Sequence, residues 1–301
     1  MQDLRKRLKG KSALYLMVLP GLAAMIVFNY LPLYGIQIAF KDFMPRRGIW
    51  NSPSAGWEYF EYMLSLPDTY KVLKNTLVIA LKKIIFGFPV PIIAAILLNE
   101  ITSKWYKKSL QTIIYLPHFI SWVILGGMLK NMLSTDGGMI NNLIGLFGVE
   151  PIYFLGSNQW FQTILVTSDI WKGFGFATIV YLAAITGIDP EQYEAAKIDG
   201  ANWMQCTRNV TMPAMMPIVM LTAILSIGGI MNANFDQIFN MYNVQVYETG
   251  DIIDTFVYRI SLVDFNYSLG TAVGLFKSVI SFILLVVSYV MAYKFSDYRI
   301  F

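Results

Sequence analysis

The chain has 301 residues, of which 56% are hydrophobic and only 14% are charged, and its formal net charge is +4. With a mean hydropathy of +0.52, it is too apolar to be an ordinary soluble domain of this length. The composition therefore indicates an integral membrane protein, in which each spanning helix needs about 20 mostly apolar residues.

Six stretches meet that requirement and predict an all-α membrane protein with six transmembrane helices. They are residues 13–39, 73–99, 110–133, 161–186, 213–236 and 270–293. Internal prolines such as Pro89, Pro91 and Pro117 predict kinks within these helices, because neighbouring helices can satisfy the carbonyls that a proline leaves free.

The first stretch follows a basic leader, MQDLRKRLKGKS, and so has some features of a signal peptide. It is much longer than a signal-peptide core and shows no clear cleavage site of small residues. We therefore predict a basic N-terminus over residues 1–12 and one six-helix domain over residues 13–301.

The second and third predicted helices differ in the polar groups that they carry. Lys82 and Lys83 are adjacent deep in the second helix, so their side chains point about 100° apart. They cannot both avoid lipid unless this helix lines a cavity or a partner subunit. In the third helix the only histidine, His118, is more often a hydrogen-bonded packing residue than a ligand, and no catalytic cluster accompanies it.

After the fourth helix, residues 187–212 form the longest polar interval of the second half of the chain. Asp189, Pro190 and Gln192 indicate a helix start, with a side-chain cap, a proline at the first helical position and an acceptor that reaches back. A helix of about 10 residues should end at Gly200, where the backbone can take a positive φ. A second helical piece, ANWMQCTRN, then leads to the fifth helix, which Pro213 and Pro217 open.

The first of these two short helices has the character of a docking surface. Ala195 and Ala196 permit the close approach of another surface, while Tyr193 and Ile198 offer apolar anchors. The alternative is an amphipathic helix that rests on lipid headgroups, and such helices favour Lys and Arg. Acidic residues predominate here, which favours a protein partner over anionic lipid. The charged residues are Asp189, Glu191, Glu194 and Asp199 against Lys197 and Arg208.

The positions of Lys and Arg in the short loops predict the orientation. Basic residues precede the first helix, separate the second from the third and follow the sixth; they are Arg5, Lys6, Arg7, Lys9, Lys11, Lys104, Lys107, Lys108, Lys294 and Arg299. The loop after the fifth helix instead carries four acids against Arg259. We expect both termini and residues 187–212 on the cytoplasmic side. The loop after the first helix does not follow the charge rule fully, because it contains Arg46 and Arg47.

The stretch EAAKIDGANWMQCTRNVTMP resembles the EAA motif of permease subunits in binding-protein-dependent ABC importers. Gly200 has the expected spacing from Glu194, and the motif ends at Pro213 after Val210 and Met212, where the family usually has Ile and Leu. Other stretches are similar to those of carbohydrate-type permeases, including importers of oligosaccharides and polysaccharides. These stretches are LLNE, YLPHFIS, DGGMINNLI and LPLYGIQIAFKDF, so the resemblance covers nearly the whole chain.

The resemblance implies a type I ABC importer permease of the bacterial cytoplasmic (inner) membrane. Its EAA segment would be a coupling helix that sits in a cleft of a cytoplasmic ATPase, through Tyr193, Glu194, Ala195, Ala196, Asp199 and Gly200. The implied partners are a second homologous permease, two copies of the ATPase, an extracytoplasmic solute-binding protein, a saccharide and the lipid bilayer, with no nucleic acid. The sequence has no phosphate-binding loop, so ATP and Mg would bind to the ATPase, and the chain is neither an enzyme by itself nor the holder of a cofactor.

Such a permease needs a path for polar cargo, and polar residues inside the membrane indicate where the path runs. At 1.5 Å per residue, the deep groups of the second, fourth and sixth helices converge about 12–16 Å below the outer face. The predicted path residues are Lys82, Lys83, Trp171, Lys172, Asn232, Asn234, Asp236 and Lys277. Two explanations are equally good for Trp171: packing within the protein, or stacking on a sugar ring. For Lys130 and Lys277, snorkelling of the side chain to the membrane interface is as good an explanation as a functional role.

The deep charges favour an anionic cargo. Four lysines outnumber Asp169 and Asp236, and ammonium groups in a low-dielectric cavity stabilise an anion that has shed its water. This predicts an acidic oligosaccharide, a uronate chain such as alginate fragments. The alternatives are a neutral oligosaccharide or another solute, with the lysines paired to acids of the partner permease. A six-helix channel is disfavoured because no pore filter or charge ring is visible.

Overall fold

The computed structural model of the chain describes residues 12–296, which form helices joined by short connections and contain no β-strand. The predicted basic N-terminus, residues 1–12, lies outside these residues except for Ser12. Contacts divide the chain into two compact units, Met1–Ser65 with Val257–Leu275 and Leu66–Phe256 with Phe276–Phe301. The division of the sequence into an N-terminus and one six-helix domain stays a prediction.

The first unit contains the first membrane helix and the segments that pack beside it. Its elements are α2 (Ser12–Met25), the π-helix η1 (Ile26–Tyr30), the 3-10 helix η2 (Leu31–Phe40), α3 (Gly48–Asn51), α4 (Glu58–Ser65), η7 (Arg259–Val263) and the start of α17 (Tyr267–Ser296). Ser268 joins the two parts of the unit, because its hydroxyl donates to the Lys41 carbonyl at 2.6 Å and accepts from the Phe43 N–H at 3.0 Å.

The second unit contains the remaining helices. In chain order they are α5 (Pro67–Gly87), α6 (Pro89–Glu100), α7 (Lys104–Tyr115), η3 (Leu116–Phe119), α8 (Trp122–Met132), α9 (Met139–Gly145), η4 (Phe154–Gly156), α10 (Phe161–Thr186), α11 (Pro190–Ile198), α12 (Trp203–Cys206), η5 (Thr207–Thr211), α13 (Met212–Gly228), α14 (Phe235–Met241), η6 (Val244–Val246), α15 (Tyr247–Gly250) and α16 (Ile253–Tyr258), which runs across the boundary.

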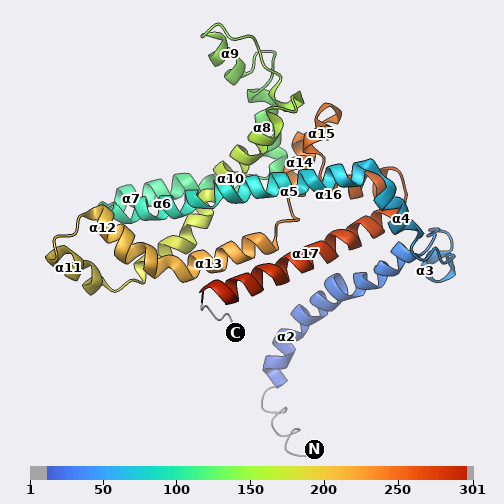
Figure 1. The fold of residues 1–301 in the computed structure, drawn as a ribbon, viewed down its shortest axis with the longest axis horizontal. Coiled ribbons are helices and arrows are strands. Elements are labelled where there is room, and N and C mark those ends of the chain that lie inside the picture. Colours follow the sequence, from blue (N-terminus) through green and yellow to red (C-terminus); the bar gives the residue numbers. More distant parts are fainter. Residues whose placement is uncertain (1–11, 297–301) are drawn as a thin grey trace, which may run out of the picture. The chain divides into compact units, whose positions relative to one another are not determined.

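Helix α10 is the centre of the second unit and packs against α5, α6, α7 and α13 (Figure 1). One apolar cluster surrounds its N-terminal half, including Leu165 and Ile238, and a second surrounds its C-terminal half, including Tyr181 and Met215. Gly175 permits the contact with α7, because a Cβ at this position would overlap the Ile114 carbonyl oxygen. The core therefore fixes α10 and the polar side chains that it carries.

The lengths and composition of the helices confirm the all-α membrane fold. Four helical segments are long and apolar enough to cross a membrane, and six are if each of two bent pairs counts as one span. The four are Leu14–Phe40, Pro67–Glu100, Trp203–Gly228 and Tyr267–Val290; the bent pairs are Lys104–Phe119 with Trp122–Met132 and Phe161–Thr186 with Pro190–Ile198.

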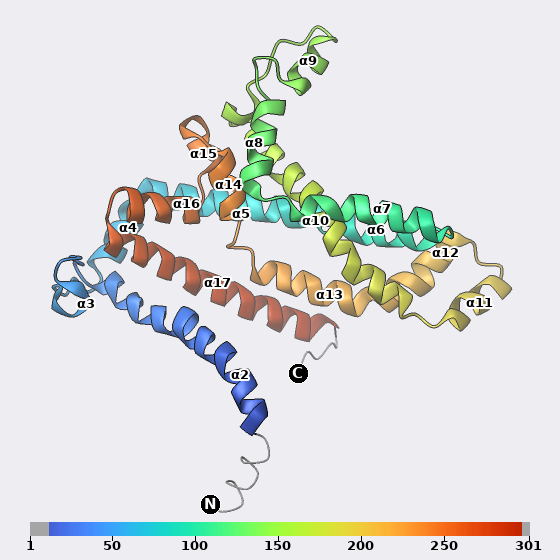
Figure 2. The ribbon, with the colours of Figure 1, turned by 180° about the vertical axis from the view of Figure 1, so that it is seen from behind.

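The third predicted helix is broken rather than kinked, so that prediction was wrong in its continuity. The two halves, α7 with η3 and then α8, meet at an angle of 97°, and both views show α8 leaving the direction of α7 to lie beside α14 (Figures 1 and 2). Pro117 lacks an N–H to continue the helix. Ser121 then starts α8 as its cap, accepting from the Ile124 N–H at 3.3 Å.

The fifth predicted helix is shorter than expected at its C-terminal end. Residues 213–236 were predicted to be helical, but α13 ends at Gly228. A loop follows, and α14 begins after Asn234, which adopts a left-handed conformation with φ 72° and caps the new helix. Asparagine tolerates this conformation better than most residues with a Cβ. The loop and Asn234 form one wall of the cavity described next.

Candidate functional site

A cavity of about 550 Å³ lies among α5, α10, α13 and the loop that follows α13. Its polar lining includes Lys83, Asp169, Asn232 and Asn234, and its apolar lining includes Phe174. Mostly apolar walls with a few convergent polar groups are typical of binding sites for small solutes. The cavity is therefore the candidate site for cargo.

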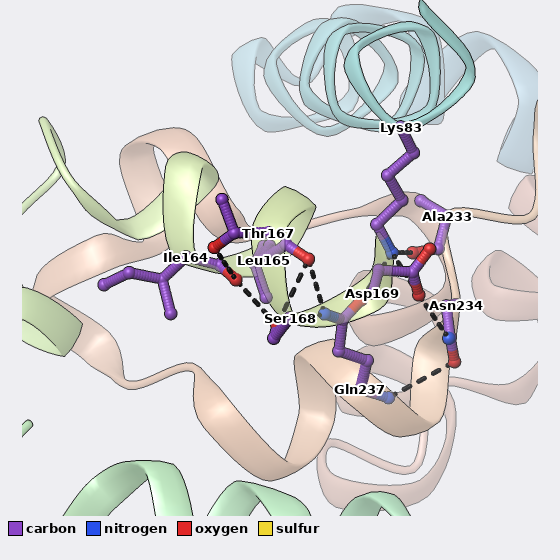
Figure 3. Close-up of polar contacts among 9 residues, drawn as sticks. All are labelled: Lys83, Ile164, Leu165, Thr167, Ser168, Asp169, Ala233, Asn234 and Gln237. Carbon is purple, nitrogen blue, oxygen red and sulfur yellow. Dashed lines mark hydrogen bonds and ion pairs between the residues drawn. The ribbon is translucent and has the colours of Figure 1, made fainter. Parts of the chain in front are cut away.

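Lys83 reaches from α5 into a set of acceptors on α10 and α14 (Figure 3). Its ammonium group donates to the Ala233 carbonyl at 3.0 Å and to the side-chain oxygen of Gln237, and it lies 3.3 Å from a carboxylate oxygen of Asp169. The Lys83 side chain is only 11% exposed. A buried cation is costly unless it is paired and hydrogen-bonded, and these three acceptors use all three donors of the ammonium.

Gln237 and Asn234 hold this arrangement in place. Gln237 is fully buried, and its amide donates to the Leu165 carbonyl at 2.7 Å and to the Ser168 hydroxyl at 2.9 Å. Asn234 donates to Asp169 at 3.1 Å (Figure 3). Asp169 thus has two partners, Lys83 and Asn234, and its position follows from both.

Lys277 forms a second ion pair close to the same loop. Its ammonium donates to Asp254 at 2.6 Å and to the side-chain oxygen of Asn232, a cavity residue, at 2.9 Å. Asp254 lies in the first turn of α16, in the acidic segment that follows the fifth predicted helix. Lys83 and Lys277, from two different helices, therefore both bind the loop that follows α13.

The other predicted path residues are not among those that line the cavity. Lys82 donates to Gln162 at 2.7 Å. Lys172 donates to the His118 carbonyl at 2.6 Å and lies over the Trp122 ring, 5.5 Å from its centroid. Trp171 and Asp236 are exposed outside the cavity.

This arrangement changes the prediction of a net positive layer. Two of the four lysines, Lys83 and Lys277, have carboxylate partners. The other two, Lys82 and Lys172, donate to neutral oxygens and lie outside the cavity lining. The excess positive charge is therefore not concentrated in the cavity.

Sequence reasoning missed Gln237 and assigned Asp169 only a general role as a countercharge. A signal for Gln237 exists, because it lies three residues after Asn234 and so follows it by one helical turn. The fifth predicted helix covers residues 213–236 and so ends one residue before Gln237. The end of α13 at Gly228 was not predicted, and so the separate helix α14, which brings Gln237 to Lys83, was not predicted either.

The segment 187–212 contains the short helix α11 and a tight turn, as predicted, but the second helical piece, α12 with η5, is continuous with α13 in one helical segment, Trp203–Gly228. Asp189 caps α11 by accepting from the Glu191 N–H at 3.0 Å, and Gly200 has a φ of +78°. The reciprocal capping box lies instead at the second helix, where Asn202 and Gln205 exchange hydrogen bonds of 2.9 and 2.7 Å. Helix α11 and its turn therefore form a shaped, locally stabilised element.

The predicted coupling residues are distributed over two sides of α11. Glu194, Ala195, Asp199 and Gly200 are exposed, while Ala196 is half-buried. Ile198 is 86% exposed. The Tyr193 hydroxyl instead hydrogen-bonds the Thr211 hydroxyl at 2.9 Å and so attaches α11 to η5. Tyr193 fixes the element, and the remaining residues form its free surface.

A set of apolar helices around a cavity with a few convergent polar groups, with the short helix α11 between two of them, defines a polytopic membrane protein. The chain belongs to the family of inner membrane components of binding-protein-dependent transport systems, whose family model matches residues 87–300. It is 40% identical to the polygalacturonan/rhamnogalacturonan transport system permease protein YteP of Bacillus subtilis (strain 168), over 100% of this chain and 95% of that protein.

Two solved structures also match nearly the whole chain. A chain of a bacterial ABC transporter involved in the import of the acidic polysaccharide alginate is 36% identical, with a TM-score of 0.91, and the match covers 98% of this chain and 99% of that one. A chain of the bacterial alginate ABC transporter in complex with an alginate pentasaccharide-bound periplasmic protein matches with a TM-score of 0.90, at the same identity and coverage.

Proposed function

We propose that this chain is the transmembrane permease subunit of an ATP-driven importer, forms half of its pore and takes up an acidic oligosaccharide. The observation that carries the proposal is the cavity, where Lys83 is held within the membrane-spanning helices by Asp169 and by two uncharged acceptors. Further support comes from the relatives, since alginate and polygalacturonan are both polymers of uronate units.

In this proposal Lys83 is the charged contact of the cargo. A substrate carboxylate replaces Asp169 beside the Lys83 ammonium, which Asp169 keeps oriented in the absence of cargo. Asn232 and Asn234 offer amide donors and acceptors to sugar hydroxyls, and apolar walls such as Phe174 meet the C–H faces of the rings. The site is a binding site only, and this chain supplies no chemical step.

The driving force comes from a partner ATPase that binds ATP and Mg. The proposed contact is the free surface of α11, formed by Glu194, Ala195, Asp199 and Ile198. A second homologous permease completes the pore, and an extracytoplasmic binding protein delivers the cargo. Both termini lie on the cytoplasmic side of the bacterial inner membrane. The family and the alginate transporter structure that contains a periplasmic protein support this assembly.

Reconstituted complexes test the proposal through uptake of a uronate oligosaccharide and a neutral oligosaccharide of equal length. Lys83→Met should lower uronate uptake at least about tenfold, because a hydrogen bond to a charged group contributes about 1.5–3 kcal/mol. Neutral uptake should change much less. Lys82→Met and Lys172→Met serve as matched controls outside the cavity, and Lys83→Met with Asp169→Asn removes the unpaired carboxylate that the single variant leaves.

A neutral oligosaccharide is the second candidate cargo, and one observation favours it. Asp169 compensates the charge of Lys83, so the cavity is close to neutral by count. With a neutral cargo, the double variant should transport as well as the native chain while Lys83→Met impairs both sugars equally. Equal loss for both cargoes would contradict the acidic assignment and support a structural ion pair.

A further inference from the structure

A second pocket, of about 320 Å³, lies in the second unit at the C-terminal end of α8. It is lined by Lys130, Leu133, Ser134, Thr135, Tyr153, Leu155, Met241, Tyr242 and Asn243. In the proposed orientation these segments follow the third and fifth spans, so the pocket faces the extracytoplasmic side. Cargo arriving from a binding protein meets this side first.

Buried asparagines fix the segments that form the pocket. Asn141, only 4% exposed, donates to the carbonyls of Leu133 at 3.1 Å, Ser134 at 2.8 Å and Ile152 at 3.0 Å. It also accepts from the Ile152 N–H at 2.8 Å. One side chain thus links the segment after α8 to the residue before Tyr153, so the pocket is built in advance of any ligand.

Asn243 performs the corresponding role on the other side of the pocket. Its amide donates to the Leu155 carbonyl at 3.0 Å, and its side-chain oxygen accepts from the Gln245 N–H at 2.9 Å. The residues that line the pocket therefore come from three segments that buried or partly buried amides hold together. Such fixed positions lower the ordering cost of binding.

Lys130 is the charged group of this pocket, and no carboxylate within residues 12–296 pairs with it. It differs in this respect from Lys83 and Lys277, whose ammonium groups each have an aspartate partner. Asp136 comes directly after the lining residue Thr135 but does not itself line the pocket. The pocket thus presents an unneutralised cation to a ligand.

Two tyrosines give the pocket an aromatic lining. Tyr153 is 50% exposed, and its ring packs where Gly156 leaves room, since a Cβ at Gly156 would overlap that ring. Tyr242 stacks on Tyr247 with 5.2 Å between ring centroids. Aromatic rings combine an apolar face with a polar hydroxyl, which suits a ligand that has both C–H faces and hydroxyl groups.

We propose that this pocket is an extracytoplasmic subsite that binds one uronate unit of the incoming oligosaccharide before the sugar reaches the Lys83 cavity. The Lys130 ammonium pairs with the carboxylate, and Tyr153 and Tyr242 contact the ring. The volume is near the lower end of the range for ligand pockets, about 300–1,000 Å³, and so suits a single sugar ring. The identity of the ligand rests on the proposed acidic cargo.

The first test compares Lys130→Met with Lys130→Arg in the reconstituted transport complex. Lys130→Met should raise the KM for a tri-uronate about two- to fivefold, because Lys130 is exposed and an exposed ion pair contributes about 0.2–1 kcal/mol, and should leave kcat and the uptake of a neutral trisaccharide nearly unchanged. Lys130→Arg should restore most of the affinity. An unchanged KM, or an equal loss for both sugars, would overturn the proposal and assign Lys130 to the C-terminal dipole of α8.

The second test measures binding without transport. In the assembled complex, tri-uronate at millimolar concentration should slow the acylation of Lys130 several-fold, followed by mass spectrometry, and a neutral trisaccharide should not. Lys71, which is paired with Asp68 and lies outside both pockets, is the internal control. Protection in a complex that does not transport uronates would refute the proposed cargo alone. Uronate transport without protection would refute the subsite alone.

Discussion

The deep lysines show what a single residue needs in order to lie within a membrane. Lys82, Lys83 and Lys172 each have an oxygen acceptor from a distant part of the chain, for Lys83 as far as 154 positions away. The sequence predicted that the helix carrying Lys82 and Lys83 lines a cavity or a partner subunit, because otherwise the two side chains could not both avoid lipid. It could not predict the acceptors, which depend on how α10 and α14 pack. Gln237 was not predicted as a partner of Lys83 for the same reason, because its position depends on the packing of α14.

The pair of Lys277 and Asp254 provides a prediction at this scale. Lys277→Met should lower the free energy of unfolding by about 1–3 kcal/mol, less than the cost for a fully buried pair, because the two side chains are 15% and 25% exposed. Lys277→Met with Asp254→Asn should recover most of the loss. Thermal unfolding of the purified complex gives the measurement.

The same variants separate a structural lysine from a cargo contact. If Lys277 only holds the loop through Asn232 and Asp254, uptake should recover in the double variant along with stability. Recovery of stability while uptake stays low would contradict the structural assignment and place Lys277 on the transport path.

Among the secondary-structure elements, the sequence predicted helix ends most accurately where residues close to the end determine its position. The cap at Asp189, the proline after it and the positive φ of Gly200 follow from residue type alone. The ends of α7, α8 and α13 were predicted less well. A proline can either kink or end a helix, and the choice at Pro117 depends on whether another helix satisfies the open carbonyls.

Gly200 gives a prediction for the α11 turn. Gly200→Val should reduce ATP-driven uptake several-fold, because a β-branched residue at a φ of +78° costs about 1–2 kcal/mol. No atom lies within 4 Å of the added Cβ, so the effect is backbone strain and not a clash. Gly200→Asn is the matched control, since asparagine tolerates this conformation, and it should retain most uptake.

Glu194→Lys complements the test by changing charge without changing the backbone. It should reduce uptake and the cargo-stimulated ATPase activity, while the amount of the chain in the membrane stays the same. If Gly200→Val and Glu194→Lys both transport at the native rate, the assignment of α11 as the coupling element is wrong.

At the scale of the whole molecule, the described residues contain one short polar helix of the kind of α11, and they also have several apolar surfaces that are exposed. Within Leu14–Phe40, the most apolar stretch of 18 residues contains no buried residue. Lipid or another subunit must cover such a surface. In the proposed assembly an ATPase dimer needs two coupling elements, and each copy of this chain would supply one through α11.

We therefore expect this chain to act with a second, related permease. Co-expression with the ATPase and the binding protein alone should yield no ATP-driven uptake, and addition of the second permease should restore it. Uptake by this chain and the ATPase as a symmetric assembly would contradict the prediction. Crosslinking from cysteines placed on α2, in a background with Cys206→Ser, would identify the covering subunit.

The bend between α7 and α8 has a consequence for how the chain enters the membrane during synthesis. Each of these helices has only 11 or 12 residues, and at 1.5 Å per residue that is about half of a hydrocarbon core. The His118 carbonyl at the break is satisfied by Lys172, which the ribosome adds 54 residues later. Neither group has its native partner until both have been made. We therefore expect the bend between α7 and α8 to reach its native position in the membrane only after α10 has been synthesised.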